Sequence, residues 1–190
     1  MVCSVCLRAQ TACICHWIRP VQTDVEVLIL QHPLEVAQTK NTGRLLHLSL
    51  ASSRILVGEA FDAPVLAPKT TLLLYPSETF QGHLPAAILP DLSCEPAVNL
   101  RLVVLDATWR KSRKMLHVNN WVQQLPRLAL DVVPASRYTI RKAHRPGQLS
   151  TLEATCLAIT QLERTATGVE SLLQAFDGFV GQQQAYQPSA

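Results

Sequence analysis

Four cysteines lie within the first fifteen residues of the chain, in the pattern C-x2-C-x6-C-x-C. This spacing suits a structural zinc ion, because each close pair supplies two neighbouring thiolates from one tight turn and two pairs complete a tetrahedron. Disulfide bonds and a redox C-x-x-C motif stay open as alternatives, although no strand-then-helix pattern surrounds the first pair. We therefore expect a zinc knuckle, with His16 as a substitute ligand. The expected ligands are Cys3, Cys6, Cys13 and Cys15.

The second group that could do chemistry is a carboxylate at the end of an apolar stretch. Residues 101–105 (RLVVL) form the clearest buried strand of the sequence, and Asp106 follows them directly. Burial disfavours the charged form of a carboxylate and raises its pKa, which makes the group a usable general base. The alternative roles of Asp106 are to cap the next helix or to pair with an arginine. Thr108 is either an N-cap or a ligand contact, and Trp109 either packs in the core or stacks on a flat ring.

The segments around these residues predict an α/β domain with a mostly parallel sheet, because strand-like and helix-like patterns alternate. Ligands bind such sheets beyond the carboxyl ends of the strands, so we expect the site in the loops at residues 75–78, 106–109 and 136–151. Strands are expected at residues 25–31, 54–57, 71–75, 101–105 and 127–133. Helices are expected at residues 44–50 with Thr42 as a cap, at 109–117, after the capping box Ser150-x-x-Glu153, and over an apolar stripe at 169–180.

Basic residues concentrate in one part of the sequence. Between residues 101 and 150, ten Lys and Arg residues stand against two Asp residues, whereas the rest of the chain is net acidic. This asymmetry predicts a basic surface and a polyanionic partner. A solvated helix surface explains the cluster at residues 110–114, but it explains poorly the second basic cluster that follows residue 136.

Several enzyme classes are missing their signatures. The sequence contains neither a G-x-G-x-x-G nor a Walker phosphate loop, which argues against a dinucleotide enzyme or an ATPase. It also contains no nucleophile elbow and no zinc-protease motif. No leader pattern follows Met1, and no apolar run approaches the roughly 18 residues that span a bilayer. We therefore expect a cytoplasmic protein without membrane contact, in which Cys94 and Cys156 are buried thiols.

Five segments, in order along nearly the whole chain, resemble the DTW-domain family. The tetrad at residues 106–109 fits the D-x-T-W signature of that family. The other segments are the cysteine cluster, Leu30-Gln31-His32-Pro33-x-Glu35 followed by Asn41-Thr42-x-Arg44-Leu45, Leu74-Tyr75-Pro76-Ser77, and Ser136-x-Tyr138-x-x-Arg141 leading to Leu149-Ser150-Thr151-x-Glu153-Ala154.

The resemblance implies a tRNA-uridine aminocarboxypropyltransferase. Such enzymes transfer the 3-amino-3-carboxypropyl group of S-adenosylmethionine to N3 of a uridine, forming acp3U and releasing methylthioadenosine. In bacterial members the uridine lies in the variable loop of tRNA, at position 47. The family is similar to the SPOUT methyltransferases, so the resemblance also implies a SPOUT-like fold, with helices on both faces of the sheet and a C-terminal trefoil knot.

The resemblance also suggests roles for individual residues. Asp106 is expected to take the proton of N3 before the nitrogen attacks carbon. Arg141 and Ser77 are expected to hold the carboxylate of the cofactor, and the basic segment 142–146 either contacts RNA or is a solvated loop. The expected cofactor-binding residues are Leu74, Tyr75, Pro76, Ser77, Leu105, Asp106, Thr108, Trp109, Tyr138, Arg141, Leu149, Ser150 and Thr151. The expected phosphate contacts are Arg44, Arg110, Lys111, Arg113, Lys114 and Arg137.

We expect two parts: a zinc-binding knuckle at residues 1–20 and a catalytic domain at residues 21–190. The expected partner is tRNA, bound by a monomer or a homodimer. Two other functions stay open. An RNA methyltransferase would use the same cofactor and differ only in the sulfonium substituent that faces the base. A zinc-containing RNA-binding protein would have no reaction to catalyse.

Overall fold

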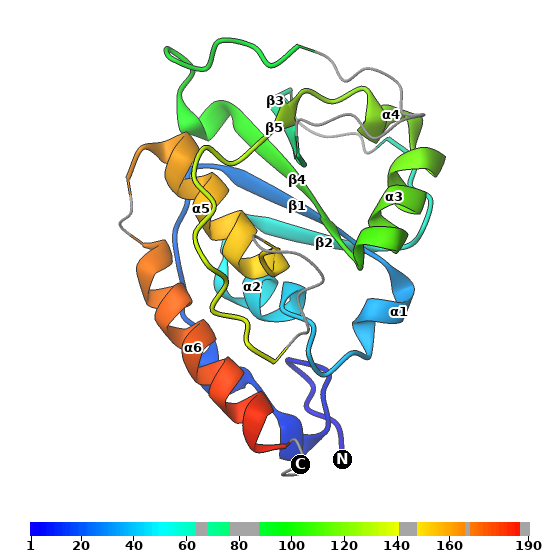
Figure 1. Cartoon of the computed structure of the whole chain (residues 1–190), viewed down its shortest axis with the longest axis vertical. Coiled ribbons are helices and arrows are strands. Elements are labelled where there is room, and N and C mark those ends of the chain that lie inside the picture. Colours follow the sequence, from blue (N-terminus) through cyan, green and yellow to red (C-terminus); the bar gives the residue numbers. More distant parts are fainter. Residues whose placement is uncertain (64–67, 77–87, 141–147, 166–167, 187–190) are drawn as a thin grey trace.

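The computed structural model describes residues 1–63, 68–76, 88–140, 148–165 and 168–186 of the 190-residue chain. Within these ranges, a parallel sheet of five strands in the order β2-β1-β4-β3-β5 forms the centre of the molecule (Figure 1). The strands are β1 (Glu26–Gln31), β2 (Ser53–Val57), β3 (Thr70–Leu74), β4 (Leu100–Asp106) and β5 (Arg127–Leu128). The predicted parallel α/β architecture is confirmed.

Helices cover both faces of the sheet, which explains why the central strands β1 and β4 are nearly continuous apolar runs. One face packs against α2, α5 and α6, and the other face packs against α3 and α4 (Figure 1). The helices are α1 (Pro33–Val36), α2 (Gly43–Ser49), α3 (Trp109–Val118), α4 (Asn120–Gln123), α5 (Thr151–Glu163) and α6 (Val169–Ala185). Short 3-10 turns are η1 (Gln10–Ala12), η2 (Cys15–Trp17) and η3 (Ala97–Asn99).

The capping box that was predicted from the sequence opens α5. The Ser150 hydroxyl accepts a hydrogen bond from the Glu153 amide at 3.2 Å, and the Glu153 carboxylate accepts one from the Ser150 amide at 2.8 Å. Glu153 also accepts from the Ser136 hydroxyl and from the Arg137 amide. One buried carboxylate therefore fixes both the start of α5 and the segment that crosses in front of it.

Two expectations were wrong. The strand expected at residues 127–133 ends at Leu128, because the Gln161 side chain takes the place of a strand neighbour: it donates to the Ala129 carbonyl and accepts from the Asp131 amide. Cys94, expected to be buried, is exposed, whereas Cys156 lies in the core and burial raises the pKa of its thiol to about 12.

The N-terminal knuckle packs against the same core as the sheet. Cys6 and Ile14 are buried in the cluster that includes Phe176 and Phe179 of α6. None of the helices in the described ranges combines the length and the apolar character that crossing a membrane requires. The division into residues 1–20 and 21–190 and the trefoil knot stay predictions.

Candidate active site and metal cluster

Asp106 is the last residue of β4 and is only 2% exposed. The register of the parallel pair places it beside Gln31, which is the last residue of β1. Two polar side chains therefore end the two central strands at the same edge of the sheet. This is the edge at which ligands bind in open α/β sheets.

Three neutral side chains donate hydrogen bonds to the Asp106 carboxylate. Gln31 Nε2 and Asn41 Nδ2 donate to Oδ2 at 2.7 and 2.8 Å, and Thr151 Oγ1 donates to Oδ1 at 2.7 Å. These donors come from the end of β1, from the segment before α2 and from the first turn of α5. Asp106 is thus the point where three elements that are distant in sequence meet.

The electrostatics of Asp106 favour its protonated form. Burial raises the pKa of this carboxyl above its usual value, the nearby Glu35 carboxylate adds to the rise, and the three hydrogen bonds oppose it. Within the described ranges no Lys or Arg forms an ion pair with Asp106. The arginine partner that the sequence left open is therefore not found there, and the carboxylate has the environment of a base.

Gly43 leaves the space that the Asp106 carboxylate occupies. A Cβ atom on residue 43 would lie 2.4 Å from Oδ2 and 2.7 Å from Cγ of Asp106, closer than any real contact of this kind. Only glycine at the start of α2 therefore allows the helix to approach this side chain.

An apolar cavity of about 320 Å3 lies on one side of this edge; we call it cavity one. It has a volume within the range of small-molecule sites, and none of its described lining residues is charged. Trp109 lines it, is 40% exposed and meets the Tyr75 ring edge-on at 5.9 Å between centroids, so this tryptophan is not a core residue. The predicted cofactor-binding residues that line cavity one are Leu74, Tyr75, Pro76, Leu105, Trp109, Leu149, Ser150 and Thr151.

A second cavity of about 300 Å3, here called cavity two, lies next to the first. The two cavities share the lining residues Ala107, Ser150 and Thr151. Cavity two is polar: its wall includes Asp106 together with Glu35 and Lys111. The predicted cofactor-binding residues that line cavity two are Asp106, Thr108, Tyr138, Ser150 and Thr151, and Lys111, which was predicted to contact phosphates, also lines it. Ser77, Arg141 and the segment 142–146 lie outside the described residues.

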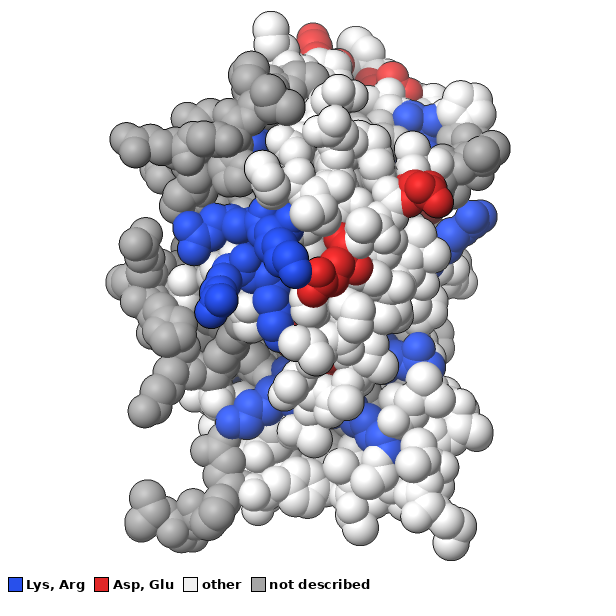
Figure 2. All heavy atoms as spheres, turned by 90° about the vertical axis from the view of Figure 1, so that its right-hand side faces the viewer, with Lys and Arg blue, Asp and Glu red and all other residues white. Residues whose placement is uncertain are grey.

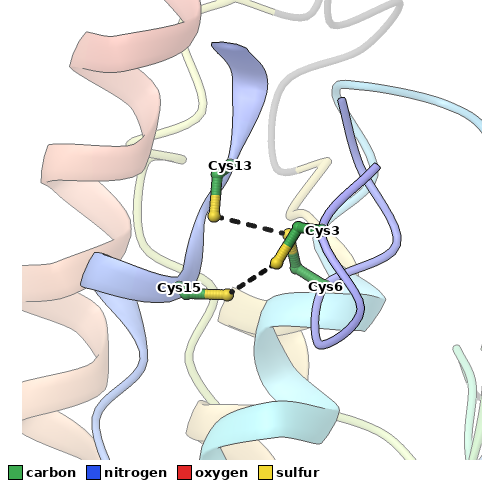
Figure 3. Close-up of side chains that lie close together, drawn as sticks. All are labelled: Cys3, Cys6, Cys13 and Cys15. Atoms are coloured by element: carbon green, nitrogen blue, oxygen red, sulfur yellow. Dashed lines mark hydrogen bonds between the residues drawn. The ribbon is translucent and has the colours of Figure 1, made fainter. Parts of the chain in front are cut away.

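The four N-terminal cysteines point toward one another (Figure 3). Their sulfur atoms all lie within 4.8 Å of each other, with Cys3 and Cys15 at 3.6 Å and Cys6 and Cys13 at 3.8 Å. A tetrahedron with zinc–sulfur bonds of about 2.3 Å has edges of about 3.8 Å, so the donor set fits this ion. The backbone amides of Cys6 and Val5 lower the pKa of the Cys3 thiol to about 6, which favours the thiolate that a metal binds. His16 is exposed and contacts the Trp17 ring in a tilted arrangement outside this group.

The knuckle is attached to the rest of the molecule by specific contacts. Trp17 lies against Gly178 of α6, where a Cβ atom would approach the indole ring to 2.1 Å, and its Nε1 donates to Gln182 at 2.7 Å. Arg8 donates to the carbonyls of Thr39 and Asn41 at 2.5 and 2.7 Å. Because the Asn41 side chain donates to Asp106, the knuckle is connected to this buried carboxylate through a single residue.

Comparison with known families agrees with this geometry. A model of the DTW domain matches residues 1–184. The chain belongs to the DTW-domain family.

Curated proteins with similar sequences are named tRNA-uridine aminocarboxypropyltransferases. A tRNA-uridine aminocarboxypropyltransferase 2 from Mus musculus is 28% identical over 90% of this chain and 60% of that protein, and one from Drosophila melanogaster is 30% identical over 84% and 66%. A tRNA-uridine aminocarboxypropyltransferase A from Arabidopsis thaliana is 26% identical over 90% and 76%. The chain thus spans about 60% of the length of the mouse relative. No solved structure matches.

The basic residues of this DTW-domain chain do not form one continuous surface. Four of the six predicted phosphate contacts lie on α3, on the face where Lys and Arg side chains gather in Figure 2. Arg44 donates to the Val5 carbonyl of the knuckle at 2.6 Å, and Arg137 pairs with Asp177 of α6 at 2.9 Å. The structure therefore brings together Arg110, Lys111, Arg113 and Lys114, and it separates them from the other two.

The spacing of residues in the sequence did not indicate which side chains surround Asp106. Gln31, Asn41 and Gly43 were part of the segments that resemble the DTW-domain family, but no role was assigned to them. A usable signal existed for Gln31, because it ends an apolar strand in the same way as Asp106. No local pattern pointed to Asn41 or Gly43, since their role depends on a contact across about sixty residues of chain.

Proposed function

We propose that this protein transfers the 3-amino-3-carboxypropyl group of S-adenosylmethionine to N3 of a uridine in tRNA, in the variable loop at position 47. A bond forms between N3 and the terminal carbon of the aminocarboxypropyl chain, and the bond from that carbon to sulfur breaks. The sulfur keeps the electron pair and leaves as neutral methylthioadenosine. The N3 proton passes to a base, and the product is acp3U.

The observation that carries this proposal is the junction of two unlike cavities beside a buried carboxylate. Cavity one is without charge among its described residues and suits the adenosine and methylthio parts of the donor. Cavity two is polar and suits the group that moves. Asp106 lines cavity two next to the shared wall, and the names of the relatives point to the same chemistry.

Asp106 is the base in this proposal. A carboxylate oxygen accepts two hydrogen bonds, and within the described residues Oδ1 accepts one, from Thr151. The remaining lone pair is available to an N–H group. The raised pKa brings the carboxyl closer to the acidity that proton transfer needs near neutral pH. The rest of the task is orientation, because a sulfonium already leaves readily and two reactants must be held in line.

The knuckle has a structural role in this proposal. Cys3, Cys6, Cys13 and Cys15 would hold a zinc ion with four thiolates, a closed site that leaves no position for substrate. The ion would order the loop that carries Arg8, and the basic face of α3 would contact RNA phosphates. Metal analysis of the purified protein, with Cys6→Ser as the variant that lacks one ligand, tests the zinc assignment.

The reaction is tested with unmodified tRNA and S-adenosylmethionine that is labelled separately in the methyl and the carboxypropyl groups. We expect the carboxypropyl label in the nucleoside acp3U, located by mass spectrometry of tRNA fragments. Transfer of the methyl label would identify an RNA methyltransferase instead. Binding of tRNA without any modification would identify a zinc-containing RNA-binding protein.

Three further features belong to this proposal. The C-terminal part of the chain forms the trefoil knot of a SPOUT-like fold, which is a rare topology. The protein acts in the cytoplasm. It works as a monomer or a homodimer, which sedimentation of the purified chain distinguishes.

A further inference from the structure

Cavity two differs from cavity one in the charges of its wall. Among the described residues, cavity one has no charged lining residue, whereas cavity two has two carboxylates and two ammonium groups. The carboxylates belong to Glu35 and Asp106, and the ammonium groups belong to Lys40 and Lys111. A wall with equal numbers of both charges is complementary to a ligand that carries one positive and one negative charge.

Two of these groups already form a pair inside the cavity. Lys111 Nζ lies 2.8 Å from Glu35 Oε1, and the side chains are 26% and 12% exposed. An ammonium group has three donors and a carboxylate has two accepting oxygens. Within the described residues each side chain uses only this one contact. The pair therefore keeps donors on Lys111 and the oxygen Oε2 on Glu35 for a ligand.

We propose that Glu35 and Lys111 bind the α-ammonium and the α-carboxylate groups of the amino-acid arm of S-adenosylmethionine, and so select a zwitterionic donor. This inference rests on the proposed function and assigns its donor site. Lys111, which the sequence suggested as a phosphate contact, then belongs to the donor site. The arm lies in cavity two while the uncharged adenosine lies in cavity one, and the carbon that reacts lies at the shared wall of Ala107, Ser150 and Thr151.

The selectivity follows from the signs of the two charges. A ligand with only a positive charge offers no anionic group to the remaining donors of Lys111, and it is repelled by that ammonium group at short range. A ligand with only a negative charge is repelled in the same way by the carboxylates of Glu35 and Asp106. The zwitterion satisfies both members of the pair with charge-assisted hydrogen bonds, which are about twice as strong as neutral ones.

A second ion pair on α3 provides the control. Lys114 lies one turn after Lys111 and pairs with Glu59 at 2.6 Å. Its side chains are 59% and 41% exposed, and neither residue lines either cavity. Lys114→Gln therefore removes the same charge from α3, and Glu59→Gln removes the charge of its partner, at residues that line neither cavity.

The experiment is isothermal titration of the protein, without tRNA, with S-adenosylmethionine and with decarboxylated S-adenosylmethionine, which keeps the sulfonium and the amine. We expect the wild type to bind the decarboxylated ligand about 10- to 100-fold more weakly, the worth of one charge-assisted contact. Lys111→Gln reduces the ratio of the two affinities to within about threefold, because the lost ammonium group is the one that binds the carboxylate. Glu35→Gln weakens both ligands and keeps the ratio, and the two control variants bind as the wild type does.

If a single variant fails to fold, the double variant Glu35→Gln/Lys111→Gln, which buries no unpaired charge, is expected to bind both ligands equally. If Lys111→Gln keeps the wild-type ratio of affinities for the two ligands, the inference is overturned and the proposed function still stands. If Lys114→Gln loses as much discrimination between the two ligands as Lys111→Gln, the inference is also overturned, because the effect would then come from the overall charge of the protein. Absence of binding of both ligands to the wild type overturns the inference and the proposed donor together.

Discussion

The two ends of the β1–β4 strand pair each hold an acidic side chain, partly buried at one end and buried at the other, in opposite electrostatic surroundings. At the amino end, Glu26 faces Arg101, which donates to both carboxylate oxygens at 3.1 Å, and Lys69 lies at 3.6 Å. At the carboxyl end, Asp106 faces Gln31 and, among the described residues, accepts hydrogen bonds from three neutral side chains. Both carboxylates lie on this strand pair, but within the described residues only Glu26 forms an ion pair.

The pKa values follow this difference. Burial raises the pKa of Glu26, but the hydrogen bond and the charge of Arg101 outweigh it, and the net pKa is lowered. Burial also raises the pKa of Asp106, and three neutral donors do not reverse the rise. A compensated carboxylate contributes to folding, whereas an uncompensated one is a strained group that a fold keeps for a reaction. The comparison therefore separates an acid held in an ion pair from the acid that we propose as the base.

The largest expected effect comes from Asp106→Asn. The amide keeps the size of the side chain, and the Thr151 hydroxyl can accept from it, so the free energy of unfolding should stay equal or rise. Loss of the base should lower the transfer rate by about 100- to 10,000-fold. Urea unfolding and single-turnover transfer measure the two quantities. A rate within tenfold of the wild type would show that Asp106 is not the base.

The opposite result is expected at the amino end. Arg101→Met keeps much of the side-chain volume but leaves Glu26 partly buried with only the more distant Lys69. The free energy of unfolding should fall by about 3 kcal/mol, while the folded protein transfers at the wild-type rate. The double variant Glu26→Gln/Arg101→Met should recover part of the stability. An intact stability in the single variant would contradict the structural role of the pair.

Gly43→Ala perturbs the carboxyl end by steric means. The new methyl group meets Asp106 Oδ2 at 2.4 Å, so either the carboxylate or α2 must move, at a cost of about 1–3 kcal/mol. Transfer should fall together with stability. Gly178→Ala is the matched control, because its methyl group meets Trp17 of the knuckle rather than Asp106. It should destabilise the protein with a smaller change in the rate of the folded fraction.

The smallest effect is a pair of opposite pH dependences. Glu26 has a lowered folded pKa, so its contribution to stability is present above its unfolded pKa and is lost as pH falls through the folded value. Asp106 has a raised folded pKa, so its contribution is present below the unfolded pKa and is lost as pH rises through the folded value.

For each group, the difference in unfolding free energy between the wild type and the variant changes by at most about 1.4 kcal/mol per pH unit, in the pH range between the folded and unfolded pKa values. Urea unfolding across the acidic range, comparing the wild type with Glu26→Gln and with Asp106→Asn, measures both. Slopes of the same sign for the two variants would refute the comparison.

Sequence patterns predicted much of the molecule that depends on local order. Apolar runs fill most of β1 and β4 between their polar ends, and the Ser150–Glu153 capping box marks the start of α5. The predicted end of β5 lies beyond its observed end, because Gln161, whose side chain takes the place of a neighbouring strand, lies thirty residues further along the chain. The same limit applied to Arg44, whose basic character is plain but whose contact with Val5 is not.

The order of the residues alone determined that a parallel sheet with a thiol cluster exists and that Asp106 ends its central strand. Both properties follow from short-range patterns: apolar runs, caps and ligand spacing. Only the tertiary structure decided that Asp106 forms no ion pair within the described residues, that Glu35 and Lys111 pair in a cavity, and that Gly43 must be small. Those properties arise where α1, α2, α3 and α5 meet one sheet edge. A contact between segments that are distant in sequence produces no recognisable periodic pattern in either segment.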